Sequence, residues 1–244
     1  MSRITRMTDR KSNGTLDRVR DYLKQIVYGG NDGIVTTFAI VAGFAGARAE
    51  GVAQIGGLAV VVFGLANLFA DAVSMGLGEF LSARSQHQMY RRRRTERLEA
   101  IRRDQTDATT RLADHFGKRG LPADEARQAA EAMAKHPPLM ADMLLSHEKA
   151  GTAPETENPA LNGLVTFGSF VCFGLLPIAP YLFRAADQTT FRLSLSLTLL
   201  ALAMLGILRG WATRESLRRA VTETLGVGST CAAVAFFVGW LVGG

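Results

Sequence analysis

The chain has 244 residues, a formal charge of +6, 48% hydrophobic residues and a mean hydropathy of +0.11. Its 2 cysteines, Cys172 and Cys231, fall in different apolar blocks, so the sequence suggests neither a disulfide framework nor a zinc knuckle. Residues 1–24 are polar and lack the apolar segment of a cleavable signal peptide.

The hydrophobic residues are concentrated in five blocks, which we interpret as transmembrane helices. In chain order they are Ile26–Ala47, Gly56–Gly78, Leu164–Phe183, Leu193–Leu208 and Leu225–Val242. A helix rises ~1.5 Å per residue, so about 20 residues cross a bilayer core of ~30 Å. The fourth block is short by itself, but Phe191 and Trp211 extend it to spanning length. We therefore expect an all-α, multi-pass membrane protein with five spans.

The polar segments between these blocks divide the chain into four parts. Residues 1–25 form a basic tail and an amphipathic lead-in, and residues 26–82 hold spans one and two. Residues 83–161 form a helical cytoplasmic insertion, and residues 162–244 hold spans three to five. Within the insertion, breaks at Gly117–Gly120 and at Pro137-Pro138 predict three helices, the first continuing from span two. In span three, Pro177 and Pro180 should kink or end the helix.

Positive charge gathers on one side of the predicted membrane topology. Of the 28 Lys and Arg residues, 7 precede the first block, 14 lie in the insertion and 4 lie between the fourth and fifth blocks. The positive-inside rule places the N-terminus and the insertion in the cytoplasm and the C-terminus outside. Nucleic-acid binding is the rival explanation of the basic pI. It is disfavoured because many of these residues are juxtamembrane, where they attract anionic headgroups.

Spans one and two carry acidic residues where lipid-facing helices should have none. Asp32 lies inside the first, and the second carries Asn67, Asp71, Met75 and Glu79 at steps of four. Each step of four rotates by only ~40°, so these residues form one stripe along the helix. A carboxylate near mid-membrane costs ~2.5–3.5 kcal/mol on insertion scales, so it needs a partner, a cavity or a cation. Together these residues indicate a cation path.

The side chains in this stripe indicate which ions the path would carry. Oxygen ligands alone would suit Mg²⁺ or Ca²⁺, whereas a thioether favours Fe²⁺, Co²⁺ or Mn²⁺. Carboxylates in a low-dielectric cavity bind protons more readily than in water, so proton exchange can accompany metal release. The alternatives are simple packing for Met75 and structural hydrogen bonds for Asp32 and Asp71.

Small residues mark two places where helices can pack closely. The Gly29-Gly30 pair would let another helix approach span one. Span two carries a row of small residues at steps of four, namely Ala66, Ala70, Ser74 and Gly78. Such a row suits tight packing, either within the chain or across a dimer axis.

The motifs YGGNDGIVTTFAIVAGFAGA and ADAVSMGLGEFLSARS resemble the first two transmembrane helices of the vacuolar iron transporter family, five-span exporters of iron(II) and manganese(II). GLLPIAPYLF and ETLGVGSTCAAVAFFVGWLVGG resemble its later signatures, so the resemblance covers the chain after roughly Thr15. It implies a homodimer that exports Fe²⁺ from the cytosol against protons, along a path between the protomers. Asp32 matches the family's carboxylate on the first helix, and Met75 its methionine on the second. For this bacterial-type sequence we expect an inner-membrane location and no cofactor besides the transported ion.

The sequence departs from this family at several positions. Of two acidic residues earlier on the first helix, Asp21 is kept at the entrance and Gln25 replaces the other. The family's glutamate on the second helix corresponds to Asn67, with Asp71 one turn later. The family's cytoplasmic module binds metal, and the matching candidates here are Glu96, Glu99, Met140, Met143 and Glu148. Arginines at 91–94 and 97 stand where much of the acid should be, so a helical hairpin with solvated faces is the alternative.

Two classes of function remain open at this stage. The preferred one is a divalent-metal transporter, and the second is a non-transporting membrane adaptor or metal sensor that acts through its helical insertion. An enzyme is disfavoured, because the sequence has no nucleophile–base pair, phosphate loop or His-rich metal motif.

Overall fold

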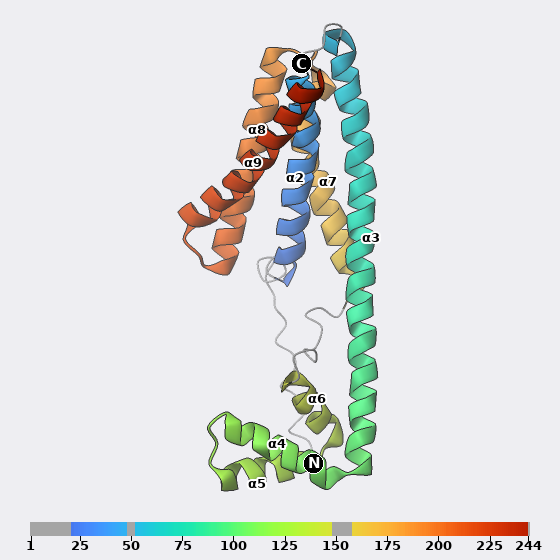
Figure 1. Cartoon of the computed structure of the whole chain (residues 1–244), viewed down its shortest axis with the longest axis vertical. Helices are drawn as coiled ribbons and strands as arrows, with labels where there is room; N and C mark the ends of the chain where they lie inside the picture. Colours follow the sequence, from blue (N-terminus) through green and yellow to red (C-terminus); the bar gives the residue numbers. More distant parts are fainter. Residues whose placement is uncertain (1–20, 48–51, 148–157, 244) are drawn as a thin grey trace, which may run out of the picture. The chain divides into compact units, whose positions relative to one another are not determined.

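The computed structural model describes residues 21–47, 52–147 and 158–243, with the backbone alone for residues 52–56 and 147. Within these ranges the chain is helical apart from short connections, which confirms the all-α prediction (Figure 1). The described helices are α2 (Leu23–Gly46), α3 (Val52–Arg103), α4 (Gln105–Lys118), α5 (Ala123–Ala134), α6 (Pro137–His147), α7 (Pro159–Phe183), α8 (Gln188–Thr213) and α9 (Leu217–Gly243).

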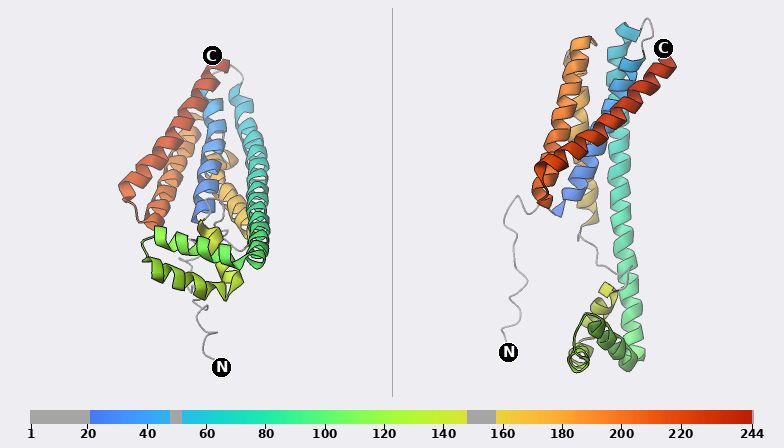
Figure 2. Two further views of the ribbon diagram at one scale, coloured as in Figure 1. Left: turned by 60° about the horizontal axis from the view of Figure 1, so that its bottom comes forward. Right: turned by 60° about the vertical axis from the view of Figure 1, so that its left-hand side comes forward.

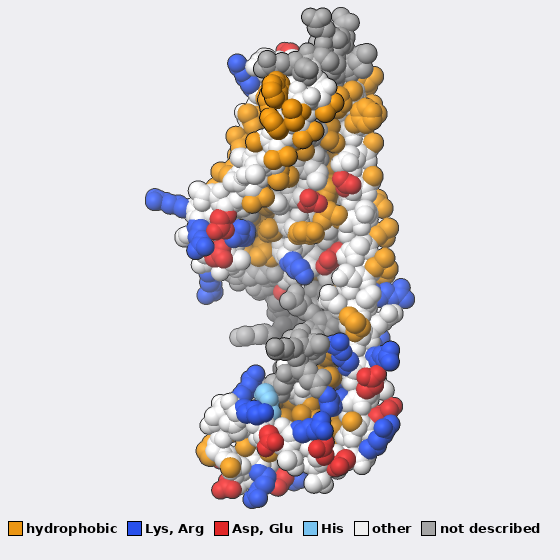
Figure 3. Space-filling model, in the orientation of Figure 1, with side chains coloured by type: hydrophobic (Ala, Val, Ile, Leu, Met, Phe, Trp, Pro, Cys, Tyr) orange, Lys and Arg blue, Asp and Glu red, His pale blue; other side chains and the backbone are white. Residues whose placement is uncertain are grey.

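The chain divides into two compact units, each with its own core. The first unit comprises Met1–Phe80 and Asn158–Gly244, and the second comprises Leu81–Glu157. The first therefore holds α2, the first half of α3, and α7 to α9. Hydrophobic side chains cover much of its visible surface, whereas charged side chains predominate on the visible surface of the second (Figure 3).

Four of the described helices are long and apolar enough to cross a membrane. They are the segment Gly57–Arg103 within α3, and helices α7, α8 and α9. Helix α2 has 24 residues, which is also enough to span at ~1.5 Å per residue. Its glycines and the adjacent Asn31 and Asp32 lower its mean hydropathy, so composition alone does not identify it as a span. The five-span topology therefore stays a prediction.

Helix α2 is the central helix of the first unit. It contacts α7, α8 and α9, and α9 crosses it obliquely (Figure 2). Ile34, Phe38 and Val41 of α2 are almost fully buried. The predicted close approach at Gly29 is confirmed, because a Cβ there would lie 2.7 Å from the carbonyl oxygen of Thr166 on α7. A side chain at this position would push the two backbones apart.

Helix α3 packs on α7 through a face that we did not predict. Leu68 and Ala72 are fully buried beside Phe170, and a Cβ on Gly76 would lie 2.9 Å from the carbonyl oxygen of Gly163. The predicted row of small residues starts two positions earlier, at Ala66, and is exposed along its length. Two residues rotate a helix by ~200°, so the two rows lie on nearly opposite faces. The row therefore does not pack against another helix in the described part of the chain, and its packing across a dimer axis stays a prediction.

The two prolines of α7 are accommodated inside the helix. The helix continues through Pro177 and Pro180 and ends at Phe183, about one turn beyond the second proline. The hydroxyl of Ser194 on α8 donates a buried hydrogen bond of 2.6 Å to the carbonyl oxygen of Pro177. This contact ties α8 to the region where the missing proline N–H groups weaken the helix.

The second unit is a small helical module formed by the end of α3 and by α4 to α6. Its core contains Ile101, Leu112, Ala130 and Met140. The predicted break after α4 is present, with Gly120 at a positive φ of 99°. A further break at Asp104 was not predicted, and its carboxylate caps α4 by accepting a 2.9 Å hydrogen bond from the Asp107 N–H.

An ion pair joins α6 to the last turns of α3 within the module. Arg94 donates to Asp142 through Nε at 2.6 Å and through Nη2 at 3.1 Å. The Tyr90 hydroxyl also donates to Asp142, at 3.3 Å. The hydrogen bonds from Arg94 hold the pKa of Asp142 below its usual range. This contact stabilises the module above the ordinary carboxylate pKa and is lost as the pH falls through the lowered value.

Candidate functional site

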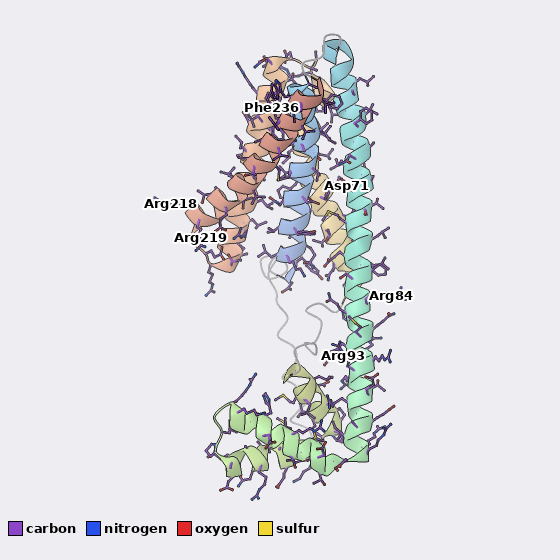
Figure 4. The ribbon with its side chains drawn as sticks, viewed as in Figure 1. Asp71, Arg84, Arg93, Arg218, Arg219 and Phe236 are labelled. Carbon is purple, nitrogen blue, oxygen red and sulfur yellow. The ribbon has the colours of Figure 1, made fainter. Side chains whose placement is uncertain are left out.

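Two aspartates, Asp32 and Asp71, lie on neighbouring helices of the first unit. Asp32 is on α2 and is half-buried. Asp71 is on α3 and is half-buried as well (Figure 4). The carboxylates are close enough for their negative charges to repel each other. No described Lys, Arg or His side chain pairs with either of them. In a low-dielectric region, two such groups need a proton or a cation between or beside them.

Asn67 orients the Asp71 carboxylate. Its Nδ2 donates a 2.7 Å hydrogen bond to Oδ2 of Asp71, one turn further along α3. A carboxylate can accept several hydrogen bonds or metal contacts, so this bond leaves the other oxygen for a further partner. The amide of Asn67 can also offer its own carbonyl oxygen as a hard, neutral ligand.

Met75 and Glu79 continue the stripe but have different surroundings. Met75 is half-buried and packs against the cluster of Leu68, Ala72 and Phe170, which agrees with a packing role for its side chain. Glu79 accepts a 3.0 Å hydrogen bond from Nε2 of Gln25 on α2. The stripe is thus tied to α2 at Glu79, and the Asp71 carboxylate lies within electrostatic range of Asp32 on α2.

The stripe lies between the buried face and the exposed face of α3. Its members, Asn67, Asp71, Met75 and Glu79, are all half-buried. The row that includes Leu68 and Ala72 is buried on one side, and the row of small residues that includes Ala70 is exposed on the other. A second molecule placed on the exposed row would therefore enclose the stripe.

Gln25 is a site residue that sequence reasoning did not assign. Its side chain is 6% exposed, its Nε2 contacts Glu79, and its Oε1 has no hydrogen-bond partner among the described residues. The spacing could have identified it. Gln25 precedes Asp32 by seven residues, which is close to two helical turns, so both lie on the same face of α2. Asp21, the proposed entrance residue, lies just before α2 and is exposed.

The described residues of one chain do not assemble a full metal site from ionisable ligands. Among the described residues, no group of three or more His, Cys, Asp or Glu side chains is placed to hold a metal ion. The first unit brings together Asp32, Asp71 and Asn67, and it places Glu79 beside Gln25. A transition-metal ion commonly takes four or more ligands, which is more than these described residues supply.

The candidate ligands of the module have other partners. Glu96 pairs with Arg92 at 2.9 Å, and Glu99 pairs with Arg103 at 3.8 Å. Met140 is fully buried in the module core, and Met143 packs against that core. Glu148 lies outside the described residues. Metal binding by the module stays a prediction, and these contacts favour a structural role for the four described residues.

Comparisons with known proteins identify the family. The model of the VIT family matches residues 23–240. The chain is 29% identical over 217 residues to "Vacuolar iron transporter 1" of Eucalyptus grandis, covering 88% of this chain and 84% of that protein. It is also 30% identical over 212 residues to "Vacuolar iron transporter" of Plasmodium falciparum, covering 83% and 75% respectively. These relatives are transporters and not enzymes. The match to the family extends over most of the first unit and over the module. The chain therefore belongs to the VIT family, the family of the vacuolar iron transporters.

Proposed function

We propose that this protein exports Fe²⁺, and also Mn²⁺, from the cytosol in exchange for protons. The observation that carries the proposal is the pair formed by Asp32 and Asp71, half-buried on neighbouring helices with no described cationic partner. A divalent ion supplies the positive charge that this pair needs, and protons can replace it when the ion leaves. The relatives' names, which specify iron, support the choice of metal. Iron is the cargo here, and no cofactor is required.

The path would run along the stripe of α3 and the facing side of α2, between two copies of the chain. Two arguments support a homodimer. The described part of one chain holds no group of three acidic or other ionisable ligands, and the exposed row of small residues lies directly beside the stripe. A second copy on this row would cover it and bring another Asp32 and Asp71 to the path. Asp21 would then stand at its entrance.

The row of small residues gives a prediction about assembly. Ala70→Leu adds a bulky side chain to an exposed position, so it should leave each chain folded and weaken the dimer by preventing close approach. Ala233→Leu, the same change at an exposed position on α9, serves as the matched control. Mass measurement in detergent should show a larger monomer fraction for Ala70→Leu alone. An unchanged dimer fraction would contradict the assignment of this face.

We propose five spans, with α2 as the first, the N-terminus and the module in the cytoplasm, and the C-terminus outside. A bacterial inner membrane would be the host membrane. A reporter fused after Gly244 should then read as extracytoplasmic, and one inserted at Gly120, in the exposed turn after α4, as cytoplasmic. Reporters that read as lying on the same side of the membrane would contradict an odd number of spans.

The stripe also predicts which ions the protein prefers. Met75→Leu keeps the volume and apolar packing but removes the sulfur, so transport of the softer ions Fe²⁺ and Co²⁺ should fall several-fold more than transport of Mg²⁺. Met204→Leu makes the same change on an exposed face of α8 and should have no effect. Flux of each ion into liposomes that contain equal amounts of protein would measure the ratio. If both variants keep the wild-type ion preference, the Met75 sulfur is not a metal ligand and its side chain has only a packing role.

An adaptor or metal sensor is the second candidate function. The separate core of the module, with helices α4 to α6, supports it, because a self-contained cytoplasmic domain can bind a partner. Glu96, Glu99, Met140, Met143 and Glu148 would be its proposed metal ligands. This candidate requires that purified protein in liposomes moves no ion at all, whereas the transporter requires flux.

A further inference from the structure

A large open groove lies in the first unit, away from the acidic stripe. Its volume is about 1060 Å³, and it is formed by the start of α2, the end of α8 and the first half of α9. On α2 it extends from Leu23 to Asn31, which is ~12 Å along the helix axis at ~1.5 Å per residue. All three helices belong to the unit that carries the membrane-spanning segments.

The groove is charged at one end and largely apolar beyond it. Lys24, Arg209 and Glu223 line the end at which α2 begins and α8 ends. Val27 and Val227 line the next turns, and the inner part has small polar side chains such as Thr230. This gradient along membrane helices matches an amphiphile whose headgroup lies at the helix ends and whose chain follows the walls.

The charged end of the groove can bind an anion. Arg209 contacts Glu223 at 2.8 Å and Glu215 at 3.3 Å, in both cases through Nη2, so its other N–H groups can still donate. Lys24 is exposed and is paired with no described carboxylate. Arg218 and Arg219 extend the positive field at the start of α9 (Figure 4). Four basic residues named here, Lys24, Arg209, Arg218 and Arg219, outnumber the three acidic ones at this end, Asp21, Glu215 and Glu223.

We propose that this groove binds an anionic phospholipid, with its phosphate held by Lys24 and Arg209 and its acyl chains along Val27 and Val227. The volume is sufficient for a headgroup and the first part of the chains. Charge complementarity favours an anionic headgroup over a zwitterionic one, because the cationic amine of phosphatidylcholine would be repelled by the basic end. The proposal is independent of the transported ion and of the position of its path.

The first test fills the groove without disturbing the protein around it. Gly226 lines the groove, and a Cβ built on it meets nothing within 4 Å, so Gly226→Leu should fold normally and occupy the space. Gly168 on α7 is equally open and lies outside the groove, which makes Gly168→Leu the matched control. Phosphatidylglycerol is titrated onto the purified full-length protein in detergent, and native mass spectrometry counts the lipids that remain bound. We expect Gly226→Leu to lose phosphatidylglycerol binding at least about fivefold, and Gly168→Leu to bind like wild type.

The second test removes charge at one position of the groove and at one position outside it. Lys24→Gln should weaken phosphatidylglycerol binding about fivefold, because a basic residue near a membrane surface contributes ~1 kcal/mol to anionic-lipid binding. Arg218→Gln removes one positive charge at the start of α9, but Arg218 does not line the groove, so its effect should be smaller. Wild-type protein should bind phosphatidylcholine of the same chain length at least about fivefold more weakly.

Four results would overturn the proposal. Equal lipid retention by wild type and Gly226→Leu would show that lipid does not enter the groove. Equal binding of phosphatidylcholine and phosphatidylglycerol would remove the recognition of charge. A change in the dimer fraction of Gly226→Leu without a change in bound lipid would show that a second copy occupies the groove. Lipid binding that appears only after deletion of residues 1–20 would show that this segment occupies it.

Discussion

Asp32→Asn is expected to abolish Fe²⁺ flux while leaving the protein folded. The substitution keeps the size and hydrogen-bonding capacity of the side chain and removes its negative charge. Unit charges ~4 Å apart attract by about 4 kcal/mol at an effective dielectric constant of ~20, and a divalent ion roughly doubles this. Since 1.4 kcal/mol corresponds to a factor of ten, flux should fall at least about tenfold. The measurement is initial Fe²⁺ uptake into liposomes with matched protein amounts.

A control at a distant acid makes this result specific. Asp114→Asn neutralises an exposed carboxylate of the module and should leave the flux unchanged. Asp71→Asn should resemble Asp32→Asn, because under this proposal both carboxylates would hold the same ion. Wild-type flux from Asp32→Asn would mean that this acid has a structural role, and the metal path would then lie elsewhere in the protein.

Gly33→Ala is expected to destabilise the first unit, and by more than an added methyl group at Gly29 or Gly76 would. A Cβ on Gly33 would collide with the carbonyl oxygen of Phe170, which belongs to the α7 backbone and cannot rotate away. Overpacking of this kind costs about 1–3 kcal/mol, and more where the backbone must move. Because α2 is the central helix and carries Asp32 next to this glycine, flux should fall along with stability. Thermal unfolding in detergent measures the first effect.

The open glycine of α7 provides the comparison for Gly33. Gly168→Ala adds the same methyl group where nothing lies within 4 Å, so it should leave stability unchanged or raise it by about 0.5–1 kcal/mol through helix propensity. If Gly33→Ala and Gly168→Ala unfold at the same temperature, α2 and α7 do not approach each other as closely as described.

The local features of the fold were predictable from the sequence because they depend on neighbouring residues. Pro122 precedes the first residue of α5, and Gly120 supplies the positive φ of the turn before it. Spacing by four also placed Asn67 and Asp71 on one face, where the side chains form a hydrogen bond. The Asp104 cap of α4 was missed although its signal, an aspartate at the start of a helix, is local as well.

The tertiary features could not be predicted in the same way, because periodicity gives the faces of a helix without their partners. Span two has two rows of small or apolar residues, and only the structure shows that the row with Gly76 meets α7 while the row with Ala70 is exposed. The contact between Gln25 and Glu79 joins residues 54 positions apart, and no local pattern encodes it. The polar residues of α2 that suggest its function are also those that lower its mean hydropathy.

The most direct test of the transport account is Fe²⁺ flux through the purified wild-type protein in sealed liposomes with an imposed pH difference. One dye inside the liposomes reports Fe²⁺ and a second reports pH. We predict that Fe²⁺ enters liposomes containing the protein faster than protein-free ones, and that protons leave as iron enters. Fe²⁺ entry equal in the two kinds of liposome would contradict the account, and the protein would then act through its module as an adaptor or sensor.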